Sequence, residues 1–446
     1  MSGPVNDPVH GPSVEPSAAG AGTAGPAPAT VVAGLVLSVL LGAVTAALGA
    51  ALPVLRSAYG TGDAAGTEVV VAYNLGALLA LLGSGPLERR LPGRSVVSWL
   101  LAAFAAGCAG MAVAPAWWAL TGCALLTGLG FGGLVLYANT AFGRPGGARG
   151  VRLLNWLHAA FGAGATTGPL LVGEWGAVRE LLWAVAALTL CCVPFRSAAD
   201  GSPTGPGPRR PVRAGRPPSA ALVACAAVAL LYAGVEAGIG ALEATHLAAT
   251  GHTPQDAARL SALFWAGLTV GRLLLPLAAR RVPHPLLVLG SLLAGAGALT
   301  AATDPGLAPA AYGLAGICLA GAFPTLLAWT VTVLPGPRRV SGVLLTANLA
   351  GSAALPFLLG HVTDPAAPAS VPLALAALTL VAGAALLTAV RAARPTSQHA
   401  LPPAHPPTAH LPTALAAAHP PTARPPGADP TPARPLRASD EKEPSA

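Results

Sequence analysis

Charged residues are scarce in this chain: Asp, Glu, Lys and Arg make up 9% of its 446 residues, whereas hydrophobic residues make up 53%. About a quarter of the residues are charged in an ordinary soluble domain, so this composition excludes a conventional soluble surface. The sequence also lacks the H-E-x-x-H, G-x-S-x-G and P-loop motifs. Their absence argues against an intramembrane enzyme and against direct coupling to ATP, and no cofactor is expected.

Groups of metal ligands are also missing. The six cysteines lie inside apolar segments, with no C-x-x-C pair and no histidine at ligand spacing. Cysteines in such surroundings behave as small apolar residues. The histidines near the C-terminus, His399, His405, His410 and His419, have no scaffold that would hold them around an ion. We therefore expect no metal site.

Long apolar runs are what the chain has in abundance. Twelve of them reach or approach the ~17–25 residues that cross a bilayer as a helix. We therefore predict an all-α membrane protein with twelve transmembrane helices. The predicted spans are residues 30–55, 67–87, 95–114, 117–142, 153–173, 178–195, 219–247, 259–279, 284–303, 308–334, 341–361 and 370–391.

Arginine alternates between the connections that join these runs. The odd-numbered connections contain three arginines, Arg56, Arg179 and Arg259, and the even-numbered ones contain fifteen. The positive-inside rule then places both termini in the cytoplasm, and we expect a multi-pass protein of the cell membrane. Topology and attraction to anionic membrane lipids explain the net charge of +8, so nucleic acid is not an expected partner. The fifteen are Arg89, Arg90, Arg94, Arg144, Arg149, Arg152, Arg196, Arg209, Arg210, Arg213, Arg216, Arg280, Arg281, Arg338 and Arg339.

The chain divides into two halves that resemble each other. Gly164–Gly173 (GATTGPLLVG) matches Gly351–Gly360 (GSAALPFLLG) at an offset of 187 residues, and Pro86–Leu91 resembles Pro276–Val282 at an offset near 190. An offset of six spans gives both halves the same orientation, related by an axis along the membrane normal. The predicted parts are a disordered cytoplasmic N-terminus (1–28), an N-terminal six-helix half (29–195), a cytoplasmic linker (196–218), a C-terminal six-helix half (219–394) and a disordered Pro/Ala/His-rich cytoplasmic tail (395–446).

Few ionisable residues lie at bilayer depth, where they are costly and often mark a pathway. Glu236 is near the middle of span 219–247. Because burial disfavours a charged carboxylate, Glu236 is the candidate proton carrier, with a purely structural interhelical hydrogen bond as the alternative. Arg272 in span 259–279 either pairs with a substrate group or a carboxylate, or extends to the cytoplasmic interface. Glu243 and His246 either line an external vestibule or are solvated residues at a helix end.

A second set of polar residues lies in the first half. Asn155 and His158 share one face of a helix at i and i+3, and amide and imidazole groups can bind hydroxyl-rich ligands. Asn139 and Asn155 also lie near the cytoplasmic ends of adjoining helices, where an interhelical hydrogen bond is the simpler interpretation. Aromatic residues including Phe161 and Trp265 could stack on a sugar ring or hold a lipophilic compound.

Four segments together resemble the major facilitator superfamily over about residues 30 to 391, and within it the fucose-permease-like branch of proton symporters. The resemblance implies a twelve-helix fold, a central cavity between the halves and alternating access by rocking, with substrates that are often sugars. The segments are Leu154–Pro169 (LNWLHAAFGAGATTGP), Tyr232–Glu236 (YAGVE), Phe264–Arg272 (FWAGLTVGR) and Gly321–Thr325 (GAFPT).

The chain also departs from that pattern. The superfamily motif after the second span keeps its pieces here with altered spacing, and the resemblance implies a loop gate at Glu88, Arg89, Arg90, Gly93 and Arg94. Sugar–proton symporters of the branch carry acids in spans 1 and 4. Here span 1 has none and the corresponding position in span 4 is Val135. Proton coupling, if present, must therefore depend on Glu236.

Three functions compete on the sequence alone. The first is a secondary transporter that moves a small organic solute, proton-linked and sugar-like. The second is a proton-driven efflux pump for lipophilic or drug-like compounds, and the third is a receptor or scaffold that does not transport. The expected partners are a small-molecule substrate, protons and membrane lipids. The oligomeric state stays open, with a monomer as the expectation.

Overall fold

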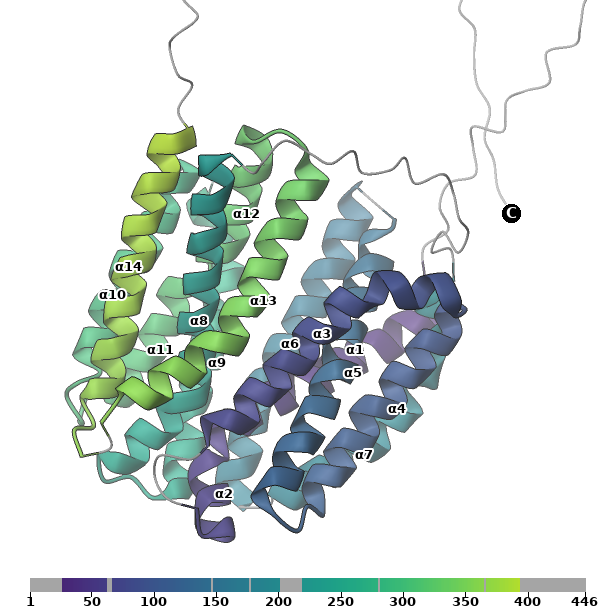
Figure 1. Ribbon diagram of the computed structural model, residues 1–446, viewed down its shortest axis with the longest axis horizontal. Coiled ribbons are helices and arrows are strands. Elements are labelled where there is room, and N and C mark those ends of the chain that lie inside the picture. The colour runs from purple at the N-terminus through teal and green to yellow at the C-terminus, as the bar shows by residue number, and fades with distance from the viewer. Residues whose placement is uncertain are drawn as a thin grey trace, which may run out of the picture. The chain divides into compact units, whose positions relative to one another are not determined.

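The computed structural model describes residues 26–61, 66–145, 147–175, 178–200, 219–279, 281–364 and 366–393. The predicted tail, most of the predicted linker and nearly all of the predicted disordered N-terminus lie outside these ranges. The described residues form fourteen α-helices and one 3-10 helix and include no strand. They fall into two bundles that lie side by side, α1 to α7 and α8 to α14 (Figure 1).

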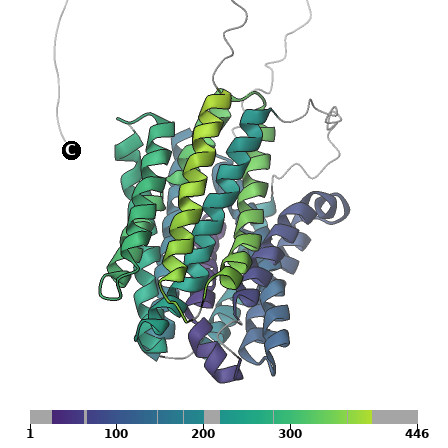
Figure 2. The same ribbon diagram turned by 60° about the vertical axis from the view of Figure 1, so that its left-hand side comes forward.

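In each bundle the first helix begins and the last helix ends on the same side of the protein, and this side is shared by both bundles. The helices of the first bundle are α1 (Pro28–Ala50), α2 (Leu52–Tyr59), α3 (Thr67–Arg90), α4 (Gly93–Ala112), α5 (Trp117–Gly143), α6 (Gly147–Trp175), α7 (Val178–Cys191) and the 3-10 helix η1 (Val193–Ala199). The helices of the second bundle are α8 (Ala220–Ala249), α9 (Pro254–Ala279), α10 (His284–Ala301), α11 (Ala308–Leu319), α12 (Ala322–Val333), α13 (Pro337–Val362) and α14 (Ser370–Ala393). Figure 2 shows the second bundle from its outer side.

Each of the twelve predicted spans falls on one or two helices of the described residues. Within the described ranges, nine helical segments are long and apolar enough to cross a membrane when α11 and α12 count as one, and the bent pair α7 and η1 makes a tenth. Helices α6 and α9, which are not among these ten, cover the two remaining predicted spans with 29 and 26 residues. The protein is therefore a multi-pass membrane protein, and most predicted ends lie within a few residues of the observed ones.

Two predicted spans are each divided into two α-helices near a proline, and a third, 178–195, continues from α7 into the 3-10 helix η1. Pro53 lies at the start of α2, and Pro324 lies in the first turn of α12. Proline has no backbone N–H and its ring clashes with the preceding turn, which accounts for both breaks. The Tyr232 hydroxyl donates a hydrogen bond to the backbone carbonyl of Leu319, 3.1 Å away, at the end of α11. The break between α11 and α12 is therefore fastened to α8.

The internal repeat is visible in the packing of the helices. A Cβ at Gly164 of α6 would overlap the backbone carbonyl of Val39 in α1. A Cβ at Gly351 of α13 would overlap the carbonyl of Leu230 in α8 in the same way. These two glycines are the ones that the sequence repeat matches at an offset of 187 residues. Small residues let membrane helices approach closely, so each half builds the same helix crossing.

The next turn of this crossing shows a compensating exchange. In the first half, Gly168 of α6 faces the backbone of Ala43 in α1. In the second half, the position that matches Gly168 is Leu355, and its side chain packs against Gly234 of α8. The glycine has moved from one helix of the pair to the other. The two halves therefore keep the same close packing with the small residue on opposite partners.

Candidate functional site

Glu236 and Arg272 form an ion pair within the helical bundle, where a membrane helix would lie deep in the bilayer. Glu236 lies near the middle of α8, and Arg272 projects from the neighbouring α9 with its Nη2 atom 3.4 Å from Glu236 Oε1. Charged groups at this depth usually face a cavity or pair with one another. Glu236 and Arg272 pair with each other, and their side chains also remain 24% and 31% exposed. Of the alternatives for Arg272, the structure shows pairing with a carboxylate.

A central cavity of about 180 Å³ borders Glu236 and is lined by both halves. The first half contributes α1, α3, α5 and α6, and the second contributes α8, α9 and α13. A cavity with walls from both halves changes shape when the halves move against each other. Its lining residues are Thr45, Val70, Tyr73, Asn74, Phe131, Phe161, Ala233, Glu236, Ala237, Gly240, Trp265, Asn348, Leu349 and Ser352.

The wall from the first half is largely aromatic. The ring centroids of Tyr73 and Phe131 lie 5.1 Å apart, and those of Phe131 and Phe161 lie 6.3 Å apart. The Tyr73 hydroxyl is 2.7 Å from Thr45 Oγ1, which also donates to the Leu41 carbonyl. Aromatic rings in this arrangement offer flat apolar surface with a polar edge.

The wall from the second half contains the charged group of the lining. It presents the Glu236 carboxylate, the Asn348 amide and the Ser352 hydroxyl, with the Trp265 indole beside them. Ser352 Oγ donates to the backbone carbonyl of Asn348 at 3.2 Å. The cavity therefore combines an aromatic side with a side rich in hydrogen-bonding groups, a combination that suits a small solute with an apolar face and polar substituents.

Four residues predicted for the substrate site lie around Glu236. Phe161 and Trp265 line the central cavity directly. Arg272 reaches it through its ion pair with Glu236. His158 is exposed on α6, one turn before Phe161, and is close enough to Arg272 for the charge of the guanidinium to act on the imidazole. The structure therefore brings these side chains together from three helices and both halves.

Two other predicted residues lie apart from this group. Asn139 Nδ2 donates to the backbone carbonyl of Val135 in its own helix, 2.9 Å away. Asn155 is exposed on α6, one turn before His158. Neither asparagine lines the central cavity. The structure shows an intrahelical hydrogen bond for Asn139 where an interhelical one was the simpler prediction.

Part of the polar and aromatic lining was not predicted. Asn348 lies 187 residues after Phe161, which is the offset of the internal repeat. Both line the central cavity from matching helices, so the repeat carried a signal that would have identified Asn348. Polar and aromatic residues that line the cavity without a predicted role include Thr45, Tyr73, Phe131, Asn348 and Ser352.

The halves make close contacts toward the distal end, the end of the bundles opposite the start of α8 and the end of α14. A Cβ at Gly49 of α1 would overlap the backbone carbonyl of Gly240 in α8, and a Cβ at Gly360 of α13 would lie 2.7 Å from Thr67 Cγ2 of α3. Between the last turn of α6 and the first turns of α9, Arg259 Nε lies 2.9 Å from Glu174 Oε1. Figure 1 shows the bundles spreading apart toward the other end, where α14 finishes.

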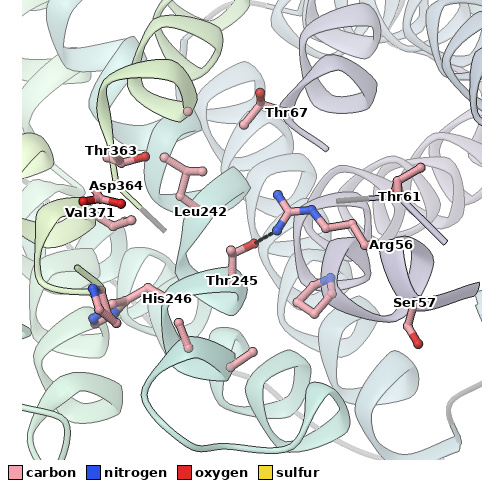
Figure 3. Close-up of a pocket in the computed structure, with 15 residues that line it drawn as sticks. Arg56, Ser57, Thr61, Thr67, Leu242, Thr245, His246, Thr363, Asp364 and Val371 are labelled. Atoms are coloured by element: carbon pink, nitrogen blue, oxygen red, sulfur yellow. Dashed lines mark hydrogen bonds between the residues drawn. The ribbon is translucent and has the colours of Figure 1, made fainter. Parts of the chain in front are cut away.

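A second cavity, here called the distal cavity, lies between the halves at this end and has a volume of about 510 Å³. Arg56 of α2 is buried in its wall and donates from Nη1 to Thr245 Oγ1 of α8, 3.4 Å away (Figure 3). Thr67 and His246 also line it, together with Asp364 beyond the end of α13. The distal cavity therefore has a wall of hydroxyl, imidazole, guanidinium and carboxylate groups.

Glu243 and His246 are not solvated residues at a helix end, and that prediction was wrong. Each is only 1% exposed, because α11 packs beside α8 there and places Tyr312 against them. His246 does line the distal cavity, so the vestibule alternative fits its position. Glu243 is absent from that lining.

The residues of the predicted loop gate lie where α3 meets α4. Glu88, Arg89 and Arg90 are exposed in the last turns of α3. Gly93 is buried at the start of α4, where a Cβ would lie 2.9 Å from that of Ala199 in η1. The gating role of these residues stays a prediction.

Arg94, the last residue of this set, forms a bidentate ion pair that the sequence analysis did not predict. Its Nε and Nη2 atoms lie 2.7 and 2.6 Å from the two carboxylate oxygens of Asp200, directly after η1. Arg144, directly after α5, donates to the backbone carbonyls of Asp200 and Ala198. Asp200 therefore links α4, the end of α5 and η1 at the end of the first bundle that is opposite the distal end.

Stability should depend on pH through this carboxylate. The hydrogen bonds from Arg94 lower the pKa of Asp200 below its ordinary value. A carboxyl group with a depressed pKa in the folded state stabilises the fold above its unfolded pKa of about 3.9 and loses that effect as pH falls through the folded value. Asp200→Asn should lower the melting temperature slightly at pH 7, because both side chains are about half exposed. The difference from wild type should vanish as the pH is lowered below about 4, and a constant difference would contradict this assignment.

Comparisons with known proteins give a structural likeness without a sequence match. No protein-family model and no curated protein sequence matches the chain. Among solved structures, a variant of the nucleoside transporter NupG superposes with a TM-score of 0.65 at 16% identity, covering 81% of this chain and 99% of that one. A variant of the peptide transporter POT gives 0.66 at 15% identity, covering 82% and 95%.

A third structure is a bacterial homologue of the human lysosomal transporter Spinster, in an inward-facing and occupied conformation. Its TM-score is 0.62 at 16% identity, and the alignment covers 81% of this chain and 96% of that one. All three are major facilitator transporters, and each aligns over almost its whole length. At this level of identity the likeness concerns the fold. The chain therefore has the major facilitator fold, with twelve membrane helices in two six-helix halves related by a parallel repeat.

Proposed function

We propose that the protein is a secondary transporter that moves a small organic solute by alternating access. The observation that carries this proposal is the central cavity, which is lined by both halves and contains the Glu236–Arg272 ion pair. A solute held between two bundles can be exposed to one side of the membrane and then to the other as the bundles rock around it. The three similar structures are named as a nucleoside transporter, a peptide transporter and a homologue of the transporter Spinster. These names support transport over an enzymatic role.

Proton linkage at Glu236 is part of the proposal. When the carboxylate takes up a proton, its attraction to Arg272 falls, and the guanidinium is released to bind a solute group or to contact His158. Binding of a solute to Arg272 would in turn favour protonation of Glu236. Such reciprocal effects are what coupling between two ligands means. Glu236 is therefore the proposed proton carrier, and Arg272 is the residue that transmits its charge state.

The proposed orientation places both termini, the linker and the tail in the cytoplasm of a cell-membrane protein, because the arginine-rich connections lie on that side. The halves meet at the distal end through the Gly49–Gly240 crossing and the Glu174–Arg259 ion pair. The distal end then faces outward and is the closed end. In this assignment the structure represents an inward-facing state.

The proposed solute is small and carries several polar groups. The central cavity is about 180 Å³, below the roughly 300–1,000 Å³ of pockets for drug-sized ligands. Tyr73, Phe161 and Trp265 can stack on a ring, while Asn348 and Glu236 can bind hydroxyl or amino groups. A sugar or another compact polar ring meets these requirements better than a large lipophilic compound.

The test begins with the melting temperature of the purified full chain in the presence of hexoses, nucleosides, amino acids, dipeptides and lipophilic cations. A ligand that binds only the folded state raises the melting temperature. We expect stabilisation by a compact polar ring compound, and the same compound should drive proton uptake into vesicles that contain the protein. Stabilisation by lipophilic cations alone would overturn the proposed solute class in favour of efflux. A stabilising solute that moves across the membrane without any proton movement would overturn the coupling.

A further inference from the structure

Glu243 is a buried carboxyl group without a hydrogen-bond partner among the described residues. Its side chain is 1% exposed, and neither Oε1 nor Oε2 forms a hydrogen bond. It lies seven residues after Glu236 on α8, which places both on nearly the same face about 10 Å apart along the helix. An isolated ionised carboxylate in an apolar interior is very costly, and such a group holds a proton instead. Burial and the lack of a partner therefore indicate that Glu243 is protonated in this state.

His246 lies one turn beyond Glu243 on α8 and lines the distal cavity. Its Nδ1 atom is 3.1 Å from the Tyr312 hydroxyl of α11, and its buried Nε2 atom has no hydrogen-bond partner in the described structure. The Tyr312 ring packs edge-on against the imidazole, with ring centroids 5.8 Å apart. Tyr312 is also close enough to Glu243 for the carboxyl charge to act on its hydroxyl. His246 lines the distal cavity, where Figure 3 shows its ring.

Few other charges stand near this group. On α2, Arg56 donates to Thr245, the residue before His246. Helices α1 and α12 contain no ionisable side chain. Asp364, beyond the end of α13, lines the distal cavity together with His246. The remaining ionisable residues on helices that pack against α8 are Tyr59 of α2, Glu68, Tyr73, Glu88, Arg89 and Arg90 of α3, Asp256, Arg259 and Arg272 of α9, Cys318 of α11, Arg338, Arg339 and His361 of α13, and Arg391 of α14. Of these, Asp256 and Arg259 pair with each other.

We propose that Glu243, His246 and Tyr312 form a second proton-binding site, separate from Glu236, that exchanges its proton with water in the distal cavity. The buried carboxyl group stores the proton, the imidazole connects it to the cavity, and the Tyr312 hydroxyl holds the imidazole in place. The site lies on the same helix as Glu236, between that residue and the distal end. It is thus positioned as the distal part of a proton path along α8.

The exchange is a balanced proton transfer. In the tautomer with hydrogen on Nδ1, His246 donates to the Tyr312 oxygen and leaves Nε2 as an acceptor. Neither Glu243 oxygen is hydrogen-bonded to Nε2 in this structure, so a rotation of the Glu243 or His246 side chain must first bring them together; the carboxyl then gives its proton to Nε2, which leaves a carboxylate and an imidazolium. Because Nε2 is buried in this state, a water molecule that enters from the distal cavity takes its proton, and the imidazolium returns to the neutral form. The reverse sequence loads Glu243 from the outside, and Tyr312 keeps its own proton throughout.

The test is infrared spectroscopy of the full chain in lipid vesicles, because a protonated carboxylic acid has a C=O stretching band that a carboxylate lacks. We expect such a band in the wild type. Glu243→Gln should remove the Glu243 component and Glu236→Gln should leave it. A band of unchanged intensity in Glu243→Gln would overturn the proposal. Glu243→Asp keeps an acid and shifts the band, so it gives the same assignment if Glu243→Gln does not fold.

The role of His246 is tested by the rate at which the band is lost after the pH on the distal side is raised. His246→Gln should slow that loss by about tenfold or more, which corresponds to about 1.4 kcal/mol in the barrier, while the melting temperature reports on folding. An unchanged rate would overturn the route through His246. The inference deepens the proposed function, but the band needs no solute. A transporter without proton coupling would fail the vesicle assay and still show the Glu243 band.

Discussion

Glu236→Gln is expected to abolish proton-driven accumulation of the solute, by a factor of about 100 or more, in a protein that still folds. Glutamine has nearly the same shape as glutamate, but it neither takes up a proton nor attracts Arg272 as a charge. If the Glu236 carboxyl group carries the proton of the transport cycle, the variant removes the coupling between proton movement and solute movement entirely. A coupling free energy of about 2.7 kcal/mol already corresponds to a factor of 100. Exchange of solute across the membrane without a proton gradient should survive, because it needs the cavity alone.

The matched control is Glu180→Gln, which removes a carboxylate from the first turn of α7, where the side chain is exposed. It should transport like the wild type. Uptake driven by a pH gradient would be compared in vesicles with equal amounts of folded protein. Full accumulation by Glu236→Gln at every pH would exclude the proton role of this residue.

A second variant separates proton transfer from simple pairing. Glu236→Gln leaves Arg272 without its partner, and removing one member of this partly buried pair should cost more than removing both. The double variant Glu236→Gln/Arg272→Gln should therefore recover the melting temperature that Glu236→Gln loses. It should not recover accumulation. Recovery of both would mean that Glu236 serves only to neutralise Arg272.

The membrane helices could be predicted because they follow from local composition. Each span requires a long apolar run, and the runs are separated by loops rich in arginine or proline. The breaks at Pro53 and Pro324 were within reach of the same reasoning, because proline interrupts helical hydrogen bonding wherever it lies. The predicted spans nevertheless ran through both prolines. Local sequence therefore determined the number of spans better than their continuity.

The central site was predicted in part because polar residues at bilayer depth are rare. Glu236 and Arg272 stand out in their spans, and the sequence indicated that Arg272 could pair with a carboxylate. The sequence could not show that the carboxylate is that of Glu236, since this depends on the rotation of α8 against α9. Tyr73 and Phe131 had no distinguishing signal, because aromatic residues occur on every face of a membrane helix. Their role follows from the closeness of α3 and α5.

Glu243 and His246 show where reasoning from position along one helix fails. Both lie near the end of α8, and the end of a membrane helix is usually wet. Here α11 covers that end with Tyr312, and α2 places Arg56 beside Thr245. Burial of a helix end depends on which helices pack around it. One sequence without its contacts does not contain that information.

Gly49→Ala is expected to open the distal end of the protein. The new methyl group would overlap the backbone carbonyl of Gly240 at the crossing of α1 and α8, and a backbone atom cannot move aside as a flexible side chain can. Overpacking of this kind costs about 1–3 kcal/mol, which shifts an equilibrium between two states by roughly 5- to 150-fold. The inward-facing state contains this crossing, so that state should lose population to one in which the halves separate at the distal end.

Gly297→Ala is the matched control, because a Cβ at Gly297 in α10 would meet nothing within 4 Å. Replacing a helical glycine with alanine at such a site normally stabilises a helix by about 0.5–1 kcal/mol, so the two variants should shift the melting temperature in opposite directions.

Accessibility would be measured by introducing Ser352→Cys in the central cavity and labelling it from the distal side, above the background of the six native cysteines. Labelling should rise at least fivefold with Gly49→Ala and stay unchanged with Gly297→Ala. If Gly49→Ala leaves both labelling and melting temperature unchanged, the α1–α8 crossing does not close the distal end, and the proposed inward-facing assignment loses its main support.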